Sequence, residues 1–407
     1  MTRIQRIETI RLGEHPRTLW VQVFTDDGLV GLGETYYVPG AVAAVIHDIA
    51  APHLLGQSPF DLERAWATLF QETNFYGYAG AEMRAISALD IALWDIVGQA
   101  CGQPIYNLIG GQVRDRIRTY NTCASYGDIR DYEDFHERPG ELAESLLAEG
   151  VTAMKIWPFD VFARRPTAVE TTHQRGRQST VASARTLVGM VDGQYISPAE
   201  LDQGVESVRR IRAAVGSRVE IAIEMHAMWN FPSAVRIARA LEPYDLMWLE
   251  EPMTPDPVDD LARLAREVRT PLCISERLFT RYAFRRVLEL GAAHIVMPDI
   301  IWTGGISEAR KIATMAEAYH LPIAPHDCTG PVNVFACLHL CASAPNAQFM
   351  ESVRAFYRGY YADIVEPNIE VRDGHISFPT TPGLGTRLRP EVRDRSDAGV
   401  QVSTLGT

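Results

Sequence analysis

The fold is decided by three apolar runs that each lead into a carboxylate: IAIEMHAMWN (221–230), LMWLEEPMTP (246–255) and TPLCISERLF (270–279). The carboxylates are Glu224, Glu250 and Glu276, and both intervals between them are 26 residues. That period accommodates one strand, one helix and two short loops. Because parallel strands end on one face of a barrel, the three carboxylates are predicted to converge there. Like charges at one place repel unless a hard cation lies between them, so the sequence predicts a metal site.

Working outward, the chain of 407 residues is long enough for two domains. Residues 1–115 are predicted to form an α+β domain, with strands at 4–12, 19–25 and 29–33 and helices near 40–51, 59–71 and 80–100. Over 116–375 eight strand-like runs alternate with helical ones, which predicts a (β/α) barrel. Residues 376–407 are predicted to return to the first domain.

Three segments stand out from this alternation. An insertion near 158–197 makes one β/α unit about twice the usual length, and we expect an ordered flap or a subunit contact there. Two loops, TYYVPG (35–40) and TNFYGYAG (73–80), are rich in aromatic residues and glycine. They are either packed turns or a lid over an active site. The candidate substrate-binding residues in the lid are Tyr36, Tyr37, Phe75 and Tyr76.

Composition and charge exclude several classes of protein. The formal net charge is −12, which argues against nucleic acid and anionic membranes as partners. The N-terminus has no apolar signal core. The sequence also contains no run of 18 apolar residues, which is the length that a membrane-spanning helix needs. Six cysteines are scattered without CxxC pairs, which is typical of a reduced, cytoplasmic protein without structural zinc.

Four of the other five predicted barrel strands also end in ionisable residues, namely Lys155, Asp299, His326 and Glu351. Asp299 can orient His326 and raise its basicity, which suits a base for a proton alpha to a carboxylate. A protonated Glu351 can then donate a hydrogen bond to the resulting enediolate. The alternative for the Asp299–His326 pair is a purely structural hydrogen bond.

The chain resembles the mandelate racemase branch of the enolase superfamily over nearly its whole length. The shared motifs are ISALDIALWD followed by YNLIGG, then LEEP, SER, PD…TGGI, APH and PGLG. The resemblance implies an N-terminal α+β capping domain on an α/β fold, a (β/α)7β modified TIM barrel. It implies Mg²⁺ on Glu224, Glu250 and Glu276, a base dyad of His326 and Asp299, and Glu351 as the electrophile.

Within that branch the chain is most similar to sugar-acid dehydratases of the galactonate dehydratase type, which have a histidine two residues after the first metal ligand. His226 stands at that position. The implied reaction is removal of the alpha proton by His326 and protonation of the leaving beta-hydroxyl by His226. The product is a 2-keto-3-deoxy sugar acid. The alternative for His226 is an ordinary histidine at the barrel rim.

Two departures from the family pattern bear on the chemistry. The first metal ligand is usually Asp, and here it is Glu224, whose extra methylene moves the carboxylate. The racemases carry Lys-x-Lys on the second strand, and here the second lysine is replaced by Trp157. Because indole cannot accept a proton, a racemase with two bases is disfavoured. Lys155 remains and is expected to hold the substrate carboxylate, with Trp157 beside the substrate.

Other functions remain open at this point. The same enediolate serves epimerases, racemases and cycloisomerases, and a metal-free aldolase would use Lys155 as a Schiff-base nucleophile. A binding protein that kept the fold without catalysis is a third possibility. The expected partner is a small carboxylate, a sugar acid whose identity and stereochemistry the sequence does not name. The family also suggests a homo-oligomer, either a dimer or an octamer.

Overall fold

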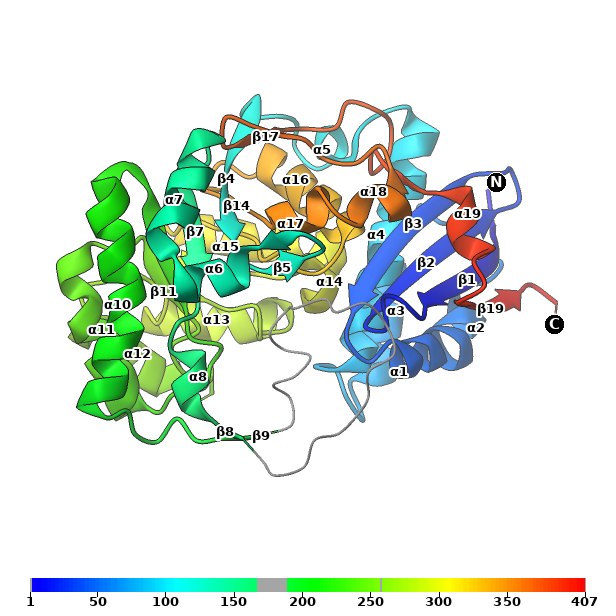
Figure 1. Cartoon of the computed structure of the whole chain (residues 1–407). Helices are drawn as coiled ribbons and strands as arrows, with labels where there is room; N and C mark the ends of the chain where they lie inside the picture. The colour runs from blue at the N-terminus through cyan, green and yellow to red at the C-terminus, as the bar shows by residue number, and fades with distance from the viewer. Residues whose placement is uncertain (1, 167–188, 257, 407) are drawn as a thin grey trace.

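The computed structural model describes residues 2–166, 189–256 and 258–406. Its N-terminal part is an antiparallel sheet with helices on one side (Figure 1). The strands are β1 (Ile4–Leu12), β2 (Thr18–Thr25) and β3 (Val30–Tyr36). The helical segments are α1 (Pro39–Ala44), the π-helix η1 (Val45–Ala50), α2 (Ala51–Leu54), α3 (Leu62–Thr73) and α4 (Ala81–Cys101). The predicted helix at 40–51 is therefore present, but half of it is a π-helix.

Helix α4 lies directly on strand β3 because two glycines of the GLG sequence leave room for it. A Cβ atom on Gly31 would be 2.0 Å from the carbonyl oxygen of Ala92, and one on Gly33 would be 1.9 Å from that of Ala88. Any side chain at these two positions would push the helix off the sheet. The close approach explains why α4 is buried along most of its length.

The barrel is built from parallel strands in the order β13-β12-β11-β10-β7-β4, with β14 pairing to β4. The strands are β4 (Arg116–Thr122), β7 (Ala153–Ile156), β10 (Glu220–Glu224), β11 (Trp248–Glu250), β12 (Leu272–Ile274), β13 (Ile295–Val296) and β14 (Met350–Ser352). The main covering helices are α7 (Pro139–Ala148), α10 (Pro198–Val215), α11 (Phe231–Leu241), α12 (Val258–Glu267), α13 (Thr280–Leu290), α15 (Gly305–Ala318) and α16 (Pro331–Ser343). The predicted (β/α)7β barrel with a capping domain is confirmed.

One predicted strand, at 321–327, is reduced to isolated parallel bridges. Ile323 bridges Val296 on one side and Ala347 on the other, and His326 bridges Asp299. The sequence there is LPIAPH, and its two prolines have no backbone N–H to donate to a ladder. The segment still occupies the seventh barrel position, so His326 projects at the same end as the other strand termini.

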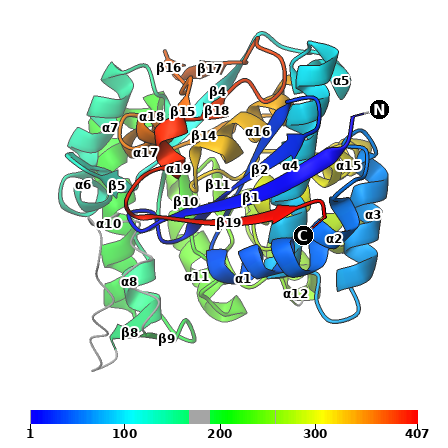
Figure 2. The same ribbon diagram turned by 90° about the vertical axis from the view of Figure 1, so that its right-hand side faces the viewer.

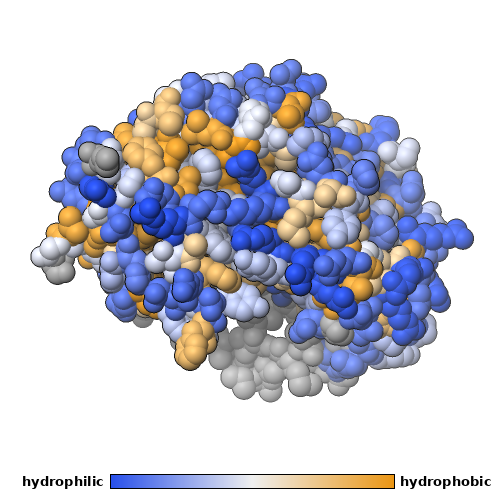
Figure 3. Space-filling model, turned by 180° about the vertical axis from the view of Figure 1, so that it is seen from behind, coloured by the Kyte–Doolittle hydropathy of each residue, from blue (hydrophilic) through white to orange (hydrophobic). Residues whose placement is uncertain are grey.

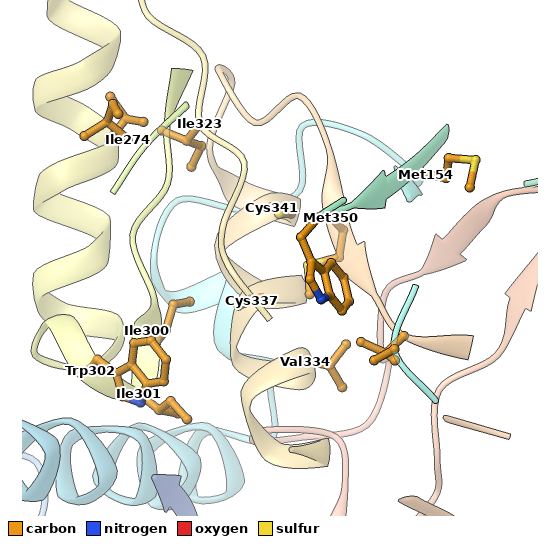
Figure 4. Packing of buried hydrophobic residues seen from close by; sticks show 14 of the residues in the cluster. Met154, Ile274, Ile300, Ile301, Trp302, Ile323, Val334, Cys337, Cys341 and Met350 are labelled. Atoms are coloured by element: carbon orange, nitrogen blue, oxygen red, sulfur yellow. The ribbon is translucent and has the colours of Figure 1, made fainter. Parts of the chain in front are cut away.

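The barrel interior is apolar toward its other end. Tyr120, Trp248 and Phe349 form a ring cluster, with Tyr120 and Trp248 at a centroid distance of 5.2 Å. Figure 4 shows part of the larger core, where Met350 of β14 lies near Cys337 of α16. This packed interior supports the polar end without leaving a pore.

The last segment of the chain crosses from the barrel to the capping sheet (Figure 2). Strand β17 (His375–Ser377) pairs with the start of β4, and β19 (Ala398–Thr404) pairs antiparallel with β1. We propose on this pairing that 1–115 is the capping domain, 116–375 the barrel and 376–407 the returning segment.

Hydrogen bonds from helix α4 fix the capping domain against the start of α15. The Oγ of Ser87 accepts from the backbone N–H of Gly304, and Asp90 Oδ2 accepts from that of Ser307 at 3.0 Å. The indole of Trp94 donates to Ser307 Oγ at 2.8 Å. Because Gly305 has φ 79° and a Cβ there would meet Asp90, the TGG sequence is required for this docking.

The insertion closes on itself at its base. Strand β8 (Arg164–Pro166) pairs antiparallel with β9 (Gly189–Val191), and Asp192 N–H donates to Ala163 O at 2.7 Å. Residues 167–188 lie outside the described part of the chain, so the expected flap or subunit contact stays a prediction. In that described part, no helix is both long and apolar enough to cross a membrane. The face in Figure 3 is largely hydrophilic, with hydrophobic residues in separate groups.

A buried histidine gives a pH-dependent contribution to stability. His339 of α16 accepts from the N–H of Tyr106 and is 2.9 Å from the carbonyl oxygen of Leu384, to which its other nitrogen donates. Burial lowers the pKa of His339 to about 4. In the unfolded chain the pKa of a histidine is about 6.5. On acidification the unfolded chain therefore binds a proton at this histidine before the folded protein does, and the free energy of unfolding falls as the pH drops from about 6.5 toward 4.

We therefore expect His339→Gln to flatten the loss of unfolding free energy on acidification. Between pH 7 and 4.5 the unfolding free energy of the wild-type protein should fall by about 2 kcal/mol more than that of the variant. The reason is that the wild-type protein has an imidazole at this position that is protonated on unfolding, and the variant has none. Urea unfolding of both proteins at the two pH values measures this. Equal losses in the two proteins would contradict the assignment.

Candidate active site

The ionisable residues predicted at the strand ends meet at one end of the barrel. In the strand register Glu224 is opposite Glu250, and Lys155 is opposite Thr122. Asp299 and His326 are bridge partners, and Glu351 lies on β14 beside β4. Glu276 follows β12 by two residues. The structure therefore brings all seven predicted rim residues into one cluster of ion pairs.

The carboxylates of Glu224, Glu250 and Glu276 are arranged as a metal site would require. Each offers an oxygen within 4.8 Å of the others, and all three residues are buried. Burial raises the pKa of Glu224 and raises that of Glu250 well above its ordinary value, and in Glu250 the Glu224 charge adds to the effect. Buried carboxylates under such mutual repulsion fit a hard divalent cation with oxygen ligands.

The extra methylene of Glu224 is accommodated by the backbone that follows it. The N–H of His226 donates to Glu224 Oε1 at 2.6 Å, and His226 has φ 47°. The N–H of Met225 and of Ala227 donate to the carbonyls of Glu250 and Glu251 on the next strand. The turn after β10 thus holds the longer carboxylate against the other two.

Lys155 is fully buried among carboxylates. Its Nζ contacts Glu250, lies 2.9 Å from Glu351 Oε1 and lies 3.7 Å from Glu224 Oε2. Burial alone would favour the neutral amine, but the charges of Glu250, Glu351 and Glu224 outweigh it and raise the pKa of Lys155 well above its ordinary value. A Schiff-base nucleophile must be a neutral amine, so this environment disfavours the aldolase alternative.

His326 and Asp299 form a hydrogen-bonded dyad. His326 Nδ1 is 2.7 Å from Asp299 Oδ2, and Nε2 is 2.8 Å from Glu276 Oε2. Burial disfavours the imidazolium, but Glu276 and Glu351 outweigh it and raise the pKa of His326 well above its ordinary value. Burial also raises the pKa of Asp299 to about 6, against the opposing His326 contact. A cation held by Glu276 would compete for the same carboxylate and free Nε2 to act as a base.

Glu351 differs from the expectation drawn from the sequence. Its Oε1 contacts the Thr122 hydroxyl and Lys155, and its Oε2 accepts from the N–H of Asp327 at 2.8 Å. Burial would raise the pKa of Glu351, but Lys155 and then His326 outweigh it and lower the pKa below its ordinary value. Lys155 and His326 therefore favour the ionised form of Glu351, and its expected role as a protonated hydrogen-bond donor stays a prediction.

His226 is part of a second histidine–carboxylate pair that was not foreseen. Its Nδ1 is 2.8 Å from Asp160 Oδ2, and the carbonyl of His226 accepts from Arg277. The Trp157 ring lies edge-on to the imidazole at 5.9 Å. The His226 imidazole is near enough to Glu276 for its charge to help lower the pKa of that carboxyl, after His326 and Arg277. Asp160 and His226 are 66 positions apart, and no sequence motif joins them.

Of the predicted lid residues, only those of the first loop approach the cluster, and they do so through Trp302. The rings of Tyr37 and Tyr36 are in contact, Tyr37 lies 5.6 Å from Trp302, and Trp302 lies 5.3 Å from His326. Arg84 of α4 donates to Tyr36 O and stacks near Trp302. Trp302 lies between the PD and TGGI motifs, so its position could have been suspected from the sequence.

The second predicted loop is placed differently. Phe75 is 93% exposed and Tyr76 is 58% exposed. Among the described contacts, none joins either ring to the charged cluster. The structure therefore does not bring these two residues to the site, and any role in substrate binding would require the loop to move.

Two family models match the chain and together span most of it. The model described as mandelate racemase / muconate lactonizing enzyme, N-terminal domain, matches residues 12–110, and the model described as enolase C-terminal domain-like matches residues 139–392. The chain therefore belongs to the mandelate racemase and muconate lactonizing enzyme group of the enolase superfamily, as the motifs predicted.

Individual relatives agree with this assignment. D-Galactonate dehydratase of Ralstonia nicotianae is 34% identical over 393 residues, covering 95% of this chain and 92% of that protein. D-Xylonate dehydratase of Haloferax volcanii is 31% identical, covering 92% of this chain and 84% of that protein. An enolase of the mandelate racemase subgroup from Agrobacterium tumefaciens, crystallised with Na and phosphate, is 42% identical with a TM-score of 0.85 over 99% of each chain. The chain is an enzyme, and the predicted hydro-lyase class is confirmed by these dehydratases.

Proposed function

We propose that this enzyme is a Mg²⁺-dependent dehydratase of a sugar acid, which forms a 2-keto-3-deoxy sugar acid. The observation that carries the proposal is the placement of two histidine–carboxylate pairs beside the Glu224–Glu250–Glu276 triad. One imidazole can remove a proton and the other can supply one, as an elimination of water requires. The dehydratase names of the relatives support the same reaction class.

The triad would hold Mg²⁺, and the ion would supply electrostatic stabilisation of the charge that develops on the substrate carboxylate. The donor set fits this ion because it consists of oxygen ligands and is buried. Lys155 lies against the same carboxylates, so it is positioned to attract the substrate carboxylate.

His326 is the proposed base. Asp299 accepts the hydrogen bond of Nδ1–H, which fixes the tautomer. Nε2 can then take the proton alpha to the carboxylate once a cation on the triad binds Glu276, which lies 2.8 Å from this nitrogen. The adjacent Trp302 and Tyr37 rings shield this side from water. Glu351, held by Lys155 and Thr122, lies 4.0 Å from Nε2 and favours the imidazolium once it has formed.

His226 is the proposed acid for the beta-hydroxyl. Asp160 binds Nδ1–H, so Nε2 can deliver a proton to the leaving oxygen as the C–O bond breaks. Trp157 stands where racemases carry their second lysine base, and indole cannot accept a proton. Elimination is therefore favoured over epimerisation or racemisation at the alpha carbon.

A panel of sugar acids incubated with the enzyme and Mg²⁺ tests the proposal. Release of a keto acid with loss of water, seen by NMR, is expected for at least one of them, and EDTA should stop it. Epimerised or cyclised products without loss of water would favour the alternatives. Failure of every sugar acid would remove the proposal. Cytoplasmic location and homo-oligomeric assembly stay predictions.

His226→Asn should separate the two halves of the reaction. Dehydration is expected to fall on the order of 10³-fold, because the leaving hydroxyl loses its proton donor. Exchange of the alpha proton with D₂O should persist, since His326 is untouched. NMR of the substrate in D₂O with this variant measures both rates. If exchange and dehydration vanish together, His226 does not act as a separate acid.

Asp160→Asn should weaken dehydration through His226. A drop of about 10² in kcat with little change in KM is expected, because the acid loses the carboxylate that orients it and stabilises its charged form. Asp160→Glu should recover part of the rate, which a merely structural role would not predict. Exchange of the alpha proton is the internal control and should continue. An unchanged kcat in Asp160→Asn would refute this role.

A further inference from the structure

A second group of potential metal ligands lies next to the carboxylate triad and has a different chemistry. His326, Cys328 and Glu351 each offer an atom within 4.8 Å of the others. Cys328 Sγ is 3.5 Å from His326 Nε2, and Glu351 Oε2 is 4.0 Å from the same nitrogen. The group combines nitrogen, sulfur and oxygen donors, whereas the triad offers oxygen alone.

These separations are close to those of a tetrahedral zinc site. Typical zinc–nitrogen and zinc–sulfur bonds place two such ligands about 3.5 Å apart across a tetrahedral angle. The distance between His326 Nε2 and Cys328 Sγ matches that value. The nitrogen–oxygen pair is wider by roughly half an ångström than the same bonds would give, a difference that a small torsion of the Glu351 side chain can close. Nitrogen and thiolate donors select zinc over magnesium.

The surroundings orient the three donors, and Glu276, 2.8 Å from His326 Nε2, must bind the Mg²⁺ of the triad before that nitrogen can ligate a second ion. Asp299 accepts a hydrogen bond from His326 Nδ1–H, the arrangement by which carboxylates fix histidines at zinc sites. The N–H of Asp327 holds Glu351 Oε2 and leaves that oxygen a second lone pair. Cys328 is partly buried, and its Sγ lies 3.5 Å from His326 Nε2.

The local charge also permits a second cation. Five buried carboxylates surround the site, namely Glu224, Glu250, Glu276, Asp299 and Glu351, and the buried Asp327 lies beside Glu351. When those five and the Cys328 thiol are ionised, Lys155 and one divalent ion on the triad together leave three negative charges uncompensated. A second divalent ion beside Glu351 would compensate two of them, so repulsion between the two ions is offset by the carboxylates.

We propose that His326, Cys328 and Glu351 form an inhibitory site for Zn²⁺ or a similar thiophilic divalent ion. Binding forms zinc–nitrogen, zinc–sulfur and zinc–oxygen bonds to His326, Cys328 and Glu351. The S–H bond of Cys328 and the Nε2–H bond of the charged His326 break, both protons pass to the solvent, and no atom changes oxidation state. The ion occupies the nitrogen that removes the substrate proton, so turnover stops while Mg²⁺ can stay on the triad. The inference concerns metal binding and stands apart from the identity of the substrate.

Co²⁺ titration of the full-length protein in saturating Mg²⁺ tests the site, because Mg²⁺ fills the oxygen-only triad. A thiolate-to-cobalt charge-transfer band is expected with one equivalent, and Zn²⁺ should abolish it. Cys328→Ser should lose the band, whereas Cys101→Ser, at an exposed cysteine remote in sequence, should keep it. The Zn²⁺ concentration for half-inhibition should rise at least ~10-fold in Cys328→Ser.

A second measurement does not depend on a variant. In the wild-type protein, Zn²⁺ should protect Cys328 from alkylation by N-ethylmaleimide, as read by mass spectrometry, while Cys101 stays reactive. A cobalt band that persists in Cys328→Ser, or its absence from the wild-type protein together with unprotected Cys328, overturns the site. If no sugar acid is a substrate, the proposed function fails, but the cobalt spectra and the alkylation of Cys328 are unaffected. The two proposals therefore fail separately.

Discussion

Replacing His326 by asparagine is expected to lower kcat for dehydration on the order of 10⁴-fold, the upper end of what a positioned general base contributes. Asparagine can keep the hydrogen bond to Asp299, but it cannot accept a proton at neutral pH. Exchange of the alpha proton with D₂O should be lost together with dehydration. This outcome contrasts with His226→Asn, in which exchange should persist.

The measurement is steady-state turnover together with NMR exchange in D₂O. His320→Asn is a matched control, because His320 lies on the exposed surface after α15, and its kcat should equal that of the wild-type protein. Exchange that continued at the wild-type rate in His326→Asn would show that another group removes the proton. Retention of the Mg²⁺-dependent change in melting temperature would show that the variant remains folded.

The second large effect concerns the triad. Glu250→Gln should weaken Mg²⁺ binding by at least ~100-fold, because changes in the groups that merely support metal ligands already cost 10–100-fold. Turnover at ordinary Mg²⁺ concentrations should fall on the order of 10³-fold with it. Glu250 also pairs with Lys155, so the variant loses a negative charge that contacts the Lys155 ammonium and would also bind Mg²⁺.

Thermal unfolding with and without Mg²⁺ measures the loss of Mg²⁺ binding, and it requires no substrate. At 100 times its dissociation constant a ligand adds about 2.7 kcal/mol of stability to the wild-type protein, and this gain should disappear in Glu250→Gln. Glu267→Gln, at a partly exposed position of α12 where Glu267 pairs with Arg263, is the control and should keep the gain. An undiminished Mg²⁺ effect in Glu250→Gln would place the ion elsewhere.

The architecture and the charged rim could be predicted because both depend on periodic features of the chain. Carboxylates in phase after apolar runs specify where parallel strands end, and that is enough to bring Glu224, Glu250 and Glu276 together. The strand at 321–327 was placed correctly but is less regular than expected. Its prolines remove ladder donors without altering the apolar pattern.

Contacts between distant segments could not be predicted. Asp160 reaches His226 only because the turn after β7 folds over the turn after β10, and nothing in the local sequence of either reports it. The ionised state of Glu351 likewise depends on where the Lys155 ammonium lies, which is a matter of packing. Phe75 and Tyr76 were predicted from composition alone, and composition does not specify the direction in which a loop points.

The self-closing base of the insertion has an evolutionary consequence. Because β8 pairs with β9 and Gly193 bridges Trp229, the ends of the excursion are fastened to each other and to the turn that follows His226. A change of length between those ends would leave His226 and the barrel rim in place. Such an excursion can therefore be exchanged as a unit during evolution while the rest of the fold is inherited unchanged.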